Sequence, residues 1–230
     1  MLPWNIVEAA KAPDGTDLLL ARRGTEWEVR AGGHTLMSNR THGSEMALAR
    51  LAFEKVPDAK RVLLGGLGLG FSLRATLDLL PPDGRIVLAE LSPALVRWNR
   101  ERVGELAGNP LQDARVQVSV GDVCERIAEA AGRYDAILLD VDNGPLALVH
   151  ETNHRLYGDA GIRRCLRSLR RGGVLTVWSA GPDERYLRRL RRAGFDATAK
   201  SVAARPGGAK RHVVFVAVKA SPIPRGSGAR

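Results

Sequence analysis

The chain has 230 residues, of which 44% are hydrophobic and 26% are charged, and its formal net charge is +10. This length and composition predict a soluble globular protein with one main domain and a full hydrophobic core. No apolar run approaches the roughly 20 residues that cross a bilayer, and the first residues lack a basic stretch followed by an apolar one, so we expect no membrane contact, no secretory signal and a cytoplasmic location.

The first 57 residues are predicted to form a short β-rich region and a lead-in helix. Three short strands are expected, at residues 17–21, 25–30 and 34–38. Ser44 is expected to cap a helix that runs to Val56 and ends at Pro57, because apolar residues recur there at helical spacing.

From residue 58 to residue 219, strand-like and helix-like segments alternate. Strands are expected at 61–64, 85–89, 116–120, 136–139 and 174–178, and helices at about 71–80, 92–106, 123–131, 160–169 and 182–190. Gly172 and Gly173 are expected to end the helix at 160–169. Alternating units of this kind predict an α/β, Rossmann-like domain with a mostly parallel sheet and helices on both faces.

The last two predicted strands, at 196–203 and 211–218, are joined by a short loop and should pair antiparallel, which brings the predicted sheet to seven strands. Residues 220–230 are rich in Pro, Gly, Ser and Arg, so this tail is expected to be disordered.

Glycines and acids follow the first four predicted strands of this domain. The first strand is followed by Gly65, Gly66, Gly68 and Gly70, and the next three by Glu90, by Asp122 and by Asp140 with Asp142. Parallel sheets bind their ligands at the carboxyl ends of the strands. Acids gathered at one edge of a sheet are costly to bury without partners, so their coincidence there favours a functional site.

The glycine spacing limits the classes of ligand that this loop could bind. A dinucleotide fingerprint needs G-x-G-x-x-G, but here Phe71 stands where the last glycine would be, and the chain has no P-loop motif. The spacing therefore argues against a nicotinamide dinucleotide and leaves a nucleoside-type ligand.

These segments resemble the class I S-adenosylmethionine-dependent methyltransferase fold. The resemblance lies in Arg61 to Gly70, Glu90, Gly121-Asp122, Tyr134 to Asp140, Leu169 to Leu175 and the final antiparallel pair. Within that fold, residues 25–180 most resemble the spermidine synthase (polyamine aminopropyltransferase) family. The more specific matches are Ser44-Glu45-Met46 at the helix start and Asp140-Val-Asp-Asn-Gly-Pro145 after the fourth strand.

The resemblance implies S-adenosylmethionine or its decarboxylated form as co-substrate, with no metal. The implied nucleoside site comprises Gly65, Gly66, Gly68, Gly70, Glu90, Leu91, Asp122, Val123 and Asp140. Glu90 would accept the ribose hydroxyls, Asp122 would accept from the adenine amino group, and Val123 would lie against the ring.

The resemblance also implies a transferase that acts on a small amine and forms a homodimer. Asp140 and Asp142 would be catalytic, and Glu45, Asp142 and Tyr157 would bind the acceptor. An aliphatic amine is mostly protonated at pH 7, and a carboxylate can orient the ammonium and assist its deprotonation.

Several positions depart from the family pattern. Leu67 and Leu69 stand where the family carries an acid in the glycine loop. Gly43-Ser44 replaces a Tyr-His pair, and Asn39-Arg40 replaces an acidic pair. These changes fall on the parts that would recognise a polyamine and the decarboxylated tail.

Three functions therefore stay open. The first is aminopropyl transfer, and the second is methyl transfer from S-adenosylmethionine to an unknown acceptor. A leucine in the loop removes a repulsion that the methionine carboxylate would feel, which favours the second. The third is a non-catalytic protein that binds a nucleoside or a nucleic acid on the same fold.

The remaining charged residues and thiols carry weaker signals. The chain has 29 arginines against 6 lysines, and the arginines of two predicted helices leave an anionic partner such as RNA open, although such runs are usually solvated faces. The spacing of His150, Glu151 and His154 resembles that of metal ligands, but we expect this segment to form a lid over the acceptor pocket. Cys124 and Cys165 form no metal or redox spacing, so both are expected to be reduced thiols.

Overall fold

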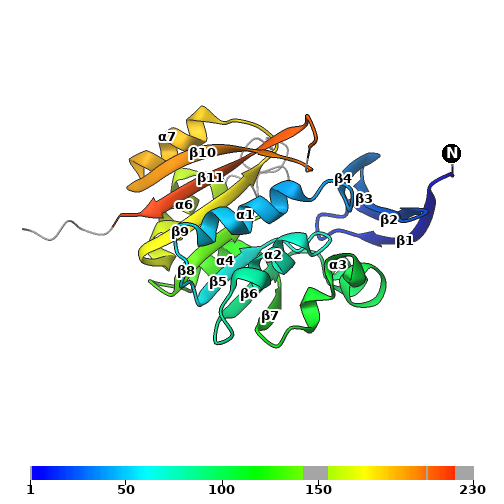
Figure 1. The fold of residues 1–230 in the computed structure, drawn as a ribbon, viewed down its shortest axis with the longest axis horizontal. Helices are drawn as coiled ribbons and strands as arrows, with labels where there is room; N and C mark the ends of the chain where they lie inside the picture. Colours follow the sequence, from blue (N-terminus) through cyan, green and yellow to red (C-terminus); the bar gives the residue numbers. More distant parts are fainter. Residues whose placement is uncertain (1, 142–154, 206, 221–230) are drawn as a thin grey trace, which may run out of the picture.

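The computed structural model describes residues 2–141, 155–205 and 207–220, which form a large seven-stranded sheet and a separate four-stranded sheet (Figure 1). The strands of the large sheet are β5 (Arg61–Gly65), β6 (Arg85–Glu90), β7 (Val116–Val120), β8 (Tyr134–Leu139), β9 (Leu169–Ser179), β10 (Phe195–Ala203) and β11 (Arg211–Lys219). Their order in space is β10-β11-β9-β8-β5-β6-β7. Only β11 runs antiparallel to its neighbours, between β9 and β10. The predicted α/β sheet with an antiparallel ending is confirmed.

This strand order fixes where a ligand site can lie. The chain passes from β5 to β6 and β7 on one side, and then returns to place β8 on the other side of β5. The loops after β5 and β8 therefore diverge at one point of the sheet edge, which is the switch point where such folds bind ligands.

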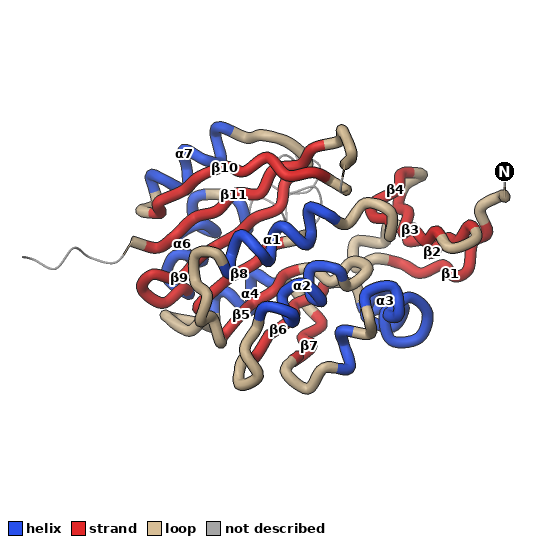
Figure 2. The backbone as a smooth tube through the Cα atoms, viewed as in Figure 1, coloured by secondary structure: helices blue, strands red, loops and turns tan. Residues whose placement is uncertain are grey.

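Helices cover both faces of the large sheet (Figure 2). One face carries α1 (Gly43–Phe53), α2 (Phe71–Leu79) and α3 (Pro93–Trp98), and the other carries α4 (Val123–Ala128), α6 (Asp159–Ser168) and α7 (Glu184–Arg192). Successive strand residues alternate between the two, so Leu64 packs under α1 and α2 while Leu63 packs under α4. Within the described ranges, no helix combines the length and the apolar character that a membrane span needs.

The N-terminal region is an antiparallel meander of four strands. These are β1 (Asn5–Lys11), β2 (Asp17–Arg23), β3 (Glu26–Ala31) and β4 (His34–Ser38). Three of them match predicted strands, and β1 is an addition. Leu20 and Val29 on this sheet form one apolar cluster with Leu69 of the glycine loop and Trp98 of α3. The small sheet is thereby packed against the loop that follows β5.

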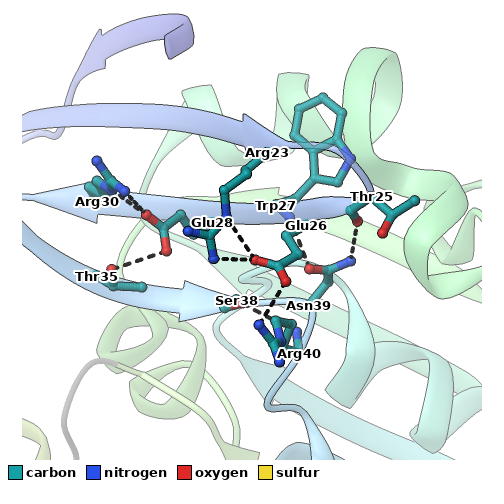
Figure 3. Close-up of polar contacts among 10 residues, drawn as sticks. All are labelled: Arg23, Thr25, Glu26, Trp27, Glu28, Arg30, Thr35, Ser38, Asn39 and Arg40. Carbon is teal, nitrogen blue, oxygen red and sulfur yellow. Dashed lines mark hydrogen bonds and ion pairs between the residues drawn. The ribbon is translucent and has the colours of Figure 1, made fainter. Parts of the chain in front are cut away.

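Polar contacts hold the connection between β4 and α1 in place (Figure 3). Asn39 accepts a hydrogen bond from the Trp27 backbone N–H at 2.9 Å and donates to the Thr25 carbonyl at 3.0 Å. Arg40 pairs with Glu26 at 2.7 Å. Asn39 and Arg40, which stand where the family pattern has an acidic pair, therefore bind β3.

Two predicted helix boundaries are wrong. Ser44 does not cap α1: the helix begins at Gly43 after His42, and the buried Ser44 side chain bonds elsewhere. Gly172 and Gly173 do not end α6, because β9 begins at Leu169, directly after that helix. Gly172 has a φ of +70° inside the strand, close to a register irregularity with β8, so this glycine serves a distortion of the strand.

The predicted helix at 92–106 also differs. Ser92 does cap α3, accepting from the Leu95 N–H at 3.4 Å. The α-helix ends at Trp98 and continues as a π-helical turn over Asn99–Val103 and a 3₁₀ turn over Gly104–Ala107. Such π-helical turns are frequent at functional sites.

Candidate active site

The glycine loop after β5 allows the ends of β5 and β8 to approach closely. Gly66 has a φ of +91°, and a Cβ at this position would lie 2.1 Å from the Asp140 carbonyl oxygen. The Asp140 N–H donates to the Gly65 carbonyl at 2.8 Å, and the Gly66 N–H donates to the Ala89 carbonyl at 2.9 Å. Only glycine fits at position 66, and its absence of a side chain places the Asp140 backbone beside the loop.

Glu90, at the end of β6, clamps this loop. One of its carboxylate oxygens accepts from the Leu67 N–H at 2.7 Å, and the other accepts from the Ser92 N–H at 2.8 Å. Its side chain is buried, with 6% of its surface exposed. Both carboxylate oxygens thus accept from backbone N–H groups, which fixes the orientation of Glu90 and shapes the loop.

Asn99, which the sequence reasoning did not identify, supports the loop from the π-helical turn. Its buried amide donates to the Gly68 carbonyl at 2.8 Å and to the Leu95 carbonyl at 2.9 Å. A lone Asn inside a predicted helix carries no signal for this role, because the role depends on the turn that follows α3.

Leu67 and Leu69 are both buried, with 2% and 4% of their surfaces exposed. Leu67 belongs to the core cluster under α1 and α2, and Leu69 belongs to the cluster of the N-terminal sheet. The structure thus gives both leucines packing roles, for which an acid would be unsuited.

The predicted adenine side lies after β6 and β7. Asp122 caps α4 by accepting from the Cys124 N–H at 2.8 Å, and its other oxygen lies 3.5 Å from the Arg155 guanidinium. Val123 is buried beneath Gly65, where an added Cβ would meet it at 2.9 Å. Leu91 leaves 51% of its surface exposed, which is an uncovered apolar side chain next to Glu90.

Asp140 and Glu45 form a pair of interacting carboxyl groups at the end of β8 and the start of α1. Burial and the repulsion of Glu45 raise the pKa of Asp140 to about 7, against a hydrogen bond from Ser72 that lowers it. Burial likewise raises the pKa of Glu45. The predicted catalytic acid and the predicted acceptor acid are therefore close enough to interact, and the charge of Glu45 adds to burial in raising the pKa of Asp140.

Ser72 lies in the first turn of α2, but its side chain does not cap that helix. The cap residue of α2 is Gly70, in a left-handed conformation with a φ of +89°. The Ser72 hydroxyl is buried and donates to the Asp140 carboxylate, so it orients the predicted catalytic acid.

The replacement of the family's Tyr-His pair by Gly43-Ser44 has a structural reason at the first position. The Gly43 N–H donates to the Ala204 carbonyl at 2.8 Å, and a Cβ on Gly43 would lie 2.9 Å from the Ala203 carbonyl oxygen. The hairpin between β10 and β11 fills the space that a tyrosine would need.

Tyr157 contacts the chain just after Asp140. It is buried in the cluster of α4, α6 and α7, on the face of the sheet opposite α1. Its hydroxyl donates to the Val141 carbonyl at 3.2 Å, and its ring meets Tyr186 edge to face. This hydrogen bond places the Tyr157 hydroxyl beside the residue that follows Asp140, and its role in binding the acceptor stays a prediction.

Other sequence predictions fall on residues 142–154 and 221–230, outside the described residues. They are the catalytic Asp142, the segment with His150, Glu151 and His154, and the disordered tail. Within the described ranges, no three His, Cys, Asp or Glu side chains gather in a manner suited to a metal ion.

The strand order, the glycine loop and the acids at the strand ends define a class I methyltransferase-like fold. No protein-family model matches the chain. In sequence, it is similar to the polyamine aminopropyltransferase of Korarchaeum cryptofilum, with 27% identity over 122 residues that cover 53% of this chain and 36% of that protein. The corresponding enzyme of Prochlorococcus marinus is 23% identical over 137 residues, or 59% of this chain and 46% of that protein.

A second type of relative is also similar. Putrescine N-methyltransferase 4 of Nicotiana tabacum is 31% identical over 129 residues, or 56% of this chain and 32% of that protein. The matches thus span less than half the length of each of these three curated relatives.

Solved structures agree on the fold. A spermidine synthase in complex with the transition-state analogue AdoDATO aligns with a TM-score of 0.78 at 16% identity, covering 93% of this chain and 73% of that chain. The spermidine synthase of Thermotoga maritima aligns with a TM-score of 0.74 at 16% identity, covering 93% and 72%. The predicted resemblance to the spermidine synthase-like family is confirmed.

Proposed function

We propose that the protein is a spermidine synthase-like transferase that binds a sulfonium nucleoside and transfers an aminopropyl-type group to a small amine. The observation that carries this proposal is the Glu45–Asp140 pair beside the glycine loop, in a fold similar to spermidine synthase. Relatives named polyamine aminopropyltransferase support the same reaction.

The proposed nucleoside site consists of the glycine loop with Glu90, Leu91, Asp122 and Val123. The Glu90 carboxylate already points to backbone N–H groups of the loop and of the turn before α3, which holds it in one orientation for the ribose hydroxyls. Gly66 and Gly68 take backbone conformations with φ of +91° and +54°, which shape the loop at the switch point where we place the ligand tail.

The proposed chemistry uses the acids to prepare the amine. An ammonium group placed between Glu45 and Asp140 gives up one proton to a carboxylate. The free nitrogen lone pair then forms a bond to the carbon beside the sulfonium, the C–S bond breaks, and its electrons remain on sulfur in the methylthioadenosine that leaves. A carboxyl group with a pKa near 7 suits this task, since it can take up and release a proton at neutral pH.

The two carboxyl groups also supply charge recognition of the acceptor. Burial disfavours the ionised form of both carboxyl groups, and the charge of Glu45 further disfavours that of Asp140. A cationic amine removes both penalties, so the site favours a positively charged substrate over a neutral one.

Methyl transfer from S-adenosylmethionine is the second candidate, and two observations favour it. The glycine loop has Leu67 and Leu69 in place of an acid, and the putrescine N-methyltransferases of Nicotiana tabacum are among the similar proteins. In that reaction the same nitrogen attacks the sulfonium methyl group, and S-adenosylhomocysteine leaves.

A product analysis distinguishes the two reactions. The protein is incubated with putrescine and either S-adenosylmethionine or its decarboxylated form, and the products are identified by mass spectrometry. Aminopropyl transfer yields methylthioadenosine and a triamine, whereas methyl transfer yields S-adenosylhomocysteine and methylputrescine. Methylated amine as the sole product would replace our first proposal by the second. Absence of turnover with both donors, across a panel of amines, would refute both proposals.

A further inference from the structure

A line of hydrogen-bonding groups leads away from Glu45 into the C-terminal hairpin. The Ser44 hydroxyl donates to the Glu45 carboxylate at 2.7 Å, and the same oxygen lies 2.9 Å from Nδ1 of His212 on β11. Ser44 is completely buried and His212 exposes 7% of its surface. The His212 ring also meets the Trp178 ring edge to face at 4.8 Å, which holds the imidazole against α1.

The number of protons on these groups determines which of them donates and which accepts in each hydrogen bond. A serine hydroxyl has one proton to donate. If the Ser44 hydroxyl donates its proton in a hydrogen bond to Glu45, the Ser44 oxygen can only accept from His212. Nδ1 of His212 must then carry the imidazole hydrogen. If instead Nδ1 is unprotonated, it competes with Glu45 for the Ser44 proton.

We propose that His212 and Ser44 are positioning residues of the acceptor pocket, in which the His212 Nδ1–H directs the Ser44 hydroxyl proton onto Glu45 and so keeps Glu45 an ionised, oriented carboxylate. This inference rests on the proposed function, since it takes Glu45 as an acceptor-binding group. The residues come from α1 and β11, 168 positions apart, and the sequence pattern did not single out His212.

The electrostatic surroundings are consistent with hydrogen bonds donated from His212 to Ser44 and from Ser44 to Glu45. Burial and the charge of Lys210 lower the pKa of His212, which keeps the imidazole neutral with one N–H to donate. The charge of Lys210, on the same hairpin, partly offsets the rise that burial causes in the pKa of Glu45, and Glu45 in turn raises the pKa of Asp140. The hydrogen bond from Ser44 opposes burial by favouring the charged form of Glu45.

The first test measures the tautomer of His212 directly in the wild-type protein by ¹⁵N NMR at pH 7, with the exposed His34 as the reference imidazole. We expect the Nδ1–H tautomer at His212. We also expect its resonances to move in Glu45→Gln, because the hydroxyl proton of Ser44 then loses its charged acceptor. An Nε2–H tautomer in the wild type would overturn the proposal. This measurement on the wild-type protein requires neither catalytic activity nor a variant that folds.

The second test uses activity with the amine that turns over in the product analysis. We expect His212→Phe, which keeps an aromatic ring against Trp178, to lower kcat/KM for the amine by about 2- to 10-fold, the range for one hydrogen bond between neutral groups. The fall of kcat/KM at acidic pH should begin at higher pH than in the wild type, because Glu45 loses a contact that favours its ionised form. His212→Gln, whose amide can donate, should restore part of the loss, and His34→Gln should change nothing.

The two proposals fail in different ways. An unchanged pH profile in His212→Phe, with normal folding and turnover, would refute the positioning role while leaving the transferase proposal intact. Absence of any turnover in the wild type would refute the transferase proposal, and the NMR tautomer would then decide alone whether His212 directs the Ser44 proton.

Discussion

Replacement of Asp140 by Asn should change how the stability of the free protein depends on pH. The pKa of Asp140 is raised from 3.8 to about 7, first by burial and then by the repulsion of Glu45. Between these two values the folded state holds a proton that the unfolded state has lost. The free energy of unfolding therefore decreases as pH rises from about 4 to about 7, at roughly 1.4 kcal/mol for each pH unit.

The full effect of this carboxyl group is large relative to the stability of a domain. A rise from 3.8 to about 7 corresponds to roughly 4 kcal/mol of unfolding free energy that is present below pH 4 and lost above pH 7. Asn has the same shape but does not ionise, and it still accepts a hydrogen bond from Ser72. Asp140→Asn should thus gain stability relative to the wild type as pH rises, by an amount on the order of 2–4 kcal/mol between pH 4.5 and pH 8.

Urea denaturation at several pH values measures this difference. Asp196→Asn is the matched control, because Asp196 is an exposed acid on β10. The reasoning requires that the curve of unfolding free energy against pH be flatter for Asp140→Asn than for both the wild type and the control. Parallel curves for all three proteins would show that the Asp140 carboxyl group is not strained by its surroundings.

Three further predictions concern the glycine loop and the acids. Glu90→Ala should abolish nucleoside binding in calorimetry and lower stability by about 2–6 kcal/mol, because it leaves two buried N–H groups without their acceptor; unchanged affinity would exclude a ribose contact. Gly66→Ala should lower stability in urea by about 3 kcal/mol or more, whereas Gly132→Ala, also at positive φ but in open space, should cost about 1–2 kcal/mol; equal losses would contradict the close approach to β8. Asp140→Asn should reduce turnover by about 100-fold or more with nearly unchanged nucleoside affinity, and equal loss of both would make this acid structural.

The main domain was predictable because its signals are local. Apolar runs of strand length alternate with helical spacing from residue 61 onward, and each of the first four runs ends in a glycine cluster or an acid. Parallel strands bring these ends to one edge by topology alone, so Gly66, Glu90 and Asp140 could be assigned to one site without knowledge of any distance.

The support of the site was not predictable from the same signals. Asn99 reaches the glycine loop through a π-helical turn that no local propensity encodes. Ser72 has the sequence position of a helix cap, but its hydroxyl bonds to Asp140 across the switch point. His212 meets Ser44 only because β11 is inserted between β9 and β10 and its hairpin covers the start of α1. Each of these contacts depends on segments distant in the sequence.

Helix and strand boundaries failed where tertiary contacts outweighed local preference. Ser44 is a good cap residue, yet the Gly43 N–H is already bonded to the Ala204 carbonyl and the Ser44 hydroxyl is drawn to Glu45. Gly172 indicates a helix end, yet it serves a distorted start of β9.

The central claim is that the sheet edge formed by the glycine loop, Glu90 and Asp122 binds a sulfonium nucleoside, and calorimetric titration of the purified protein tests it most directly. The ligands are S-adenosylmethionine, its decarboxylated form and methylthioadenosine, with Glu90→Ala as the control protein. The account predicts saturable one-to-one binding of methylthioadenosine and of at least one of the two sulfonium compounds, lost in Glu90→Ala. No binding of any of the three to the wild-type protein would contradict it.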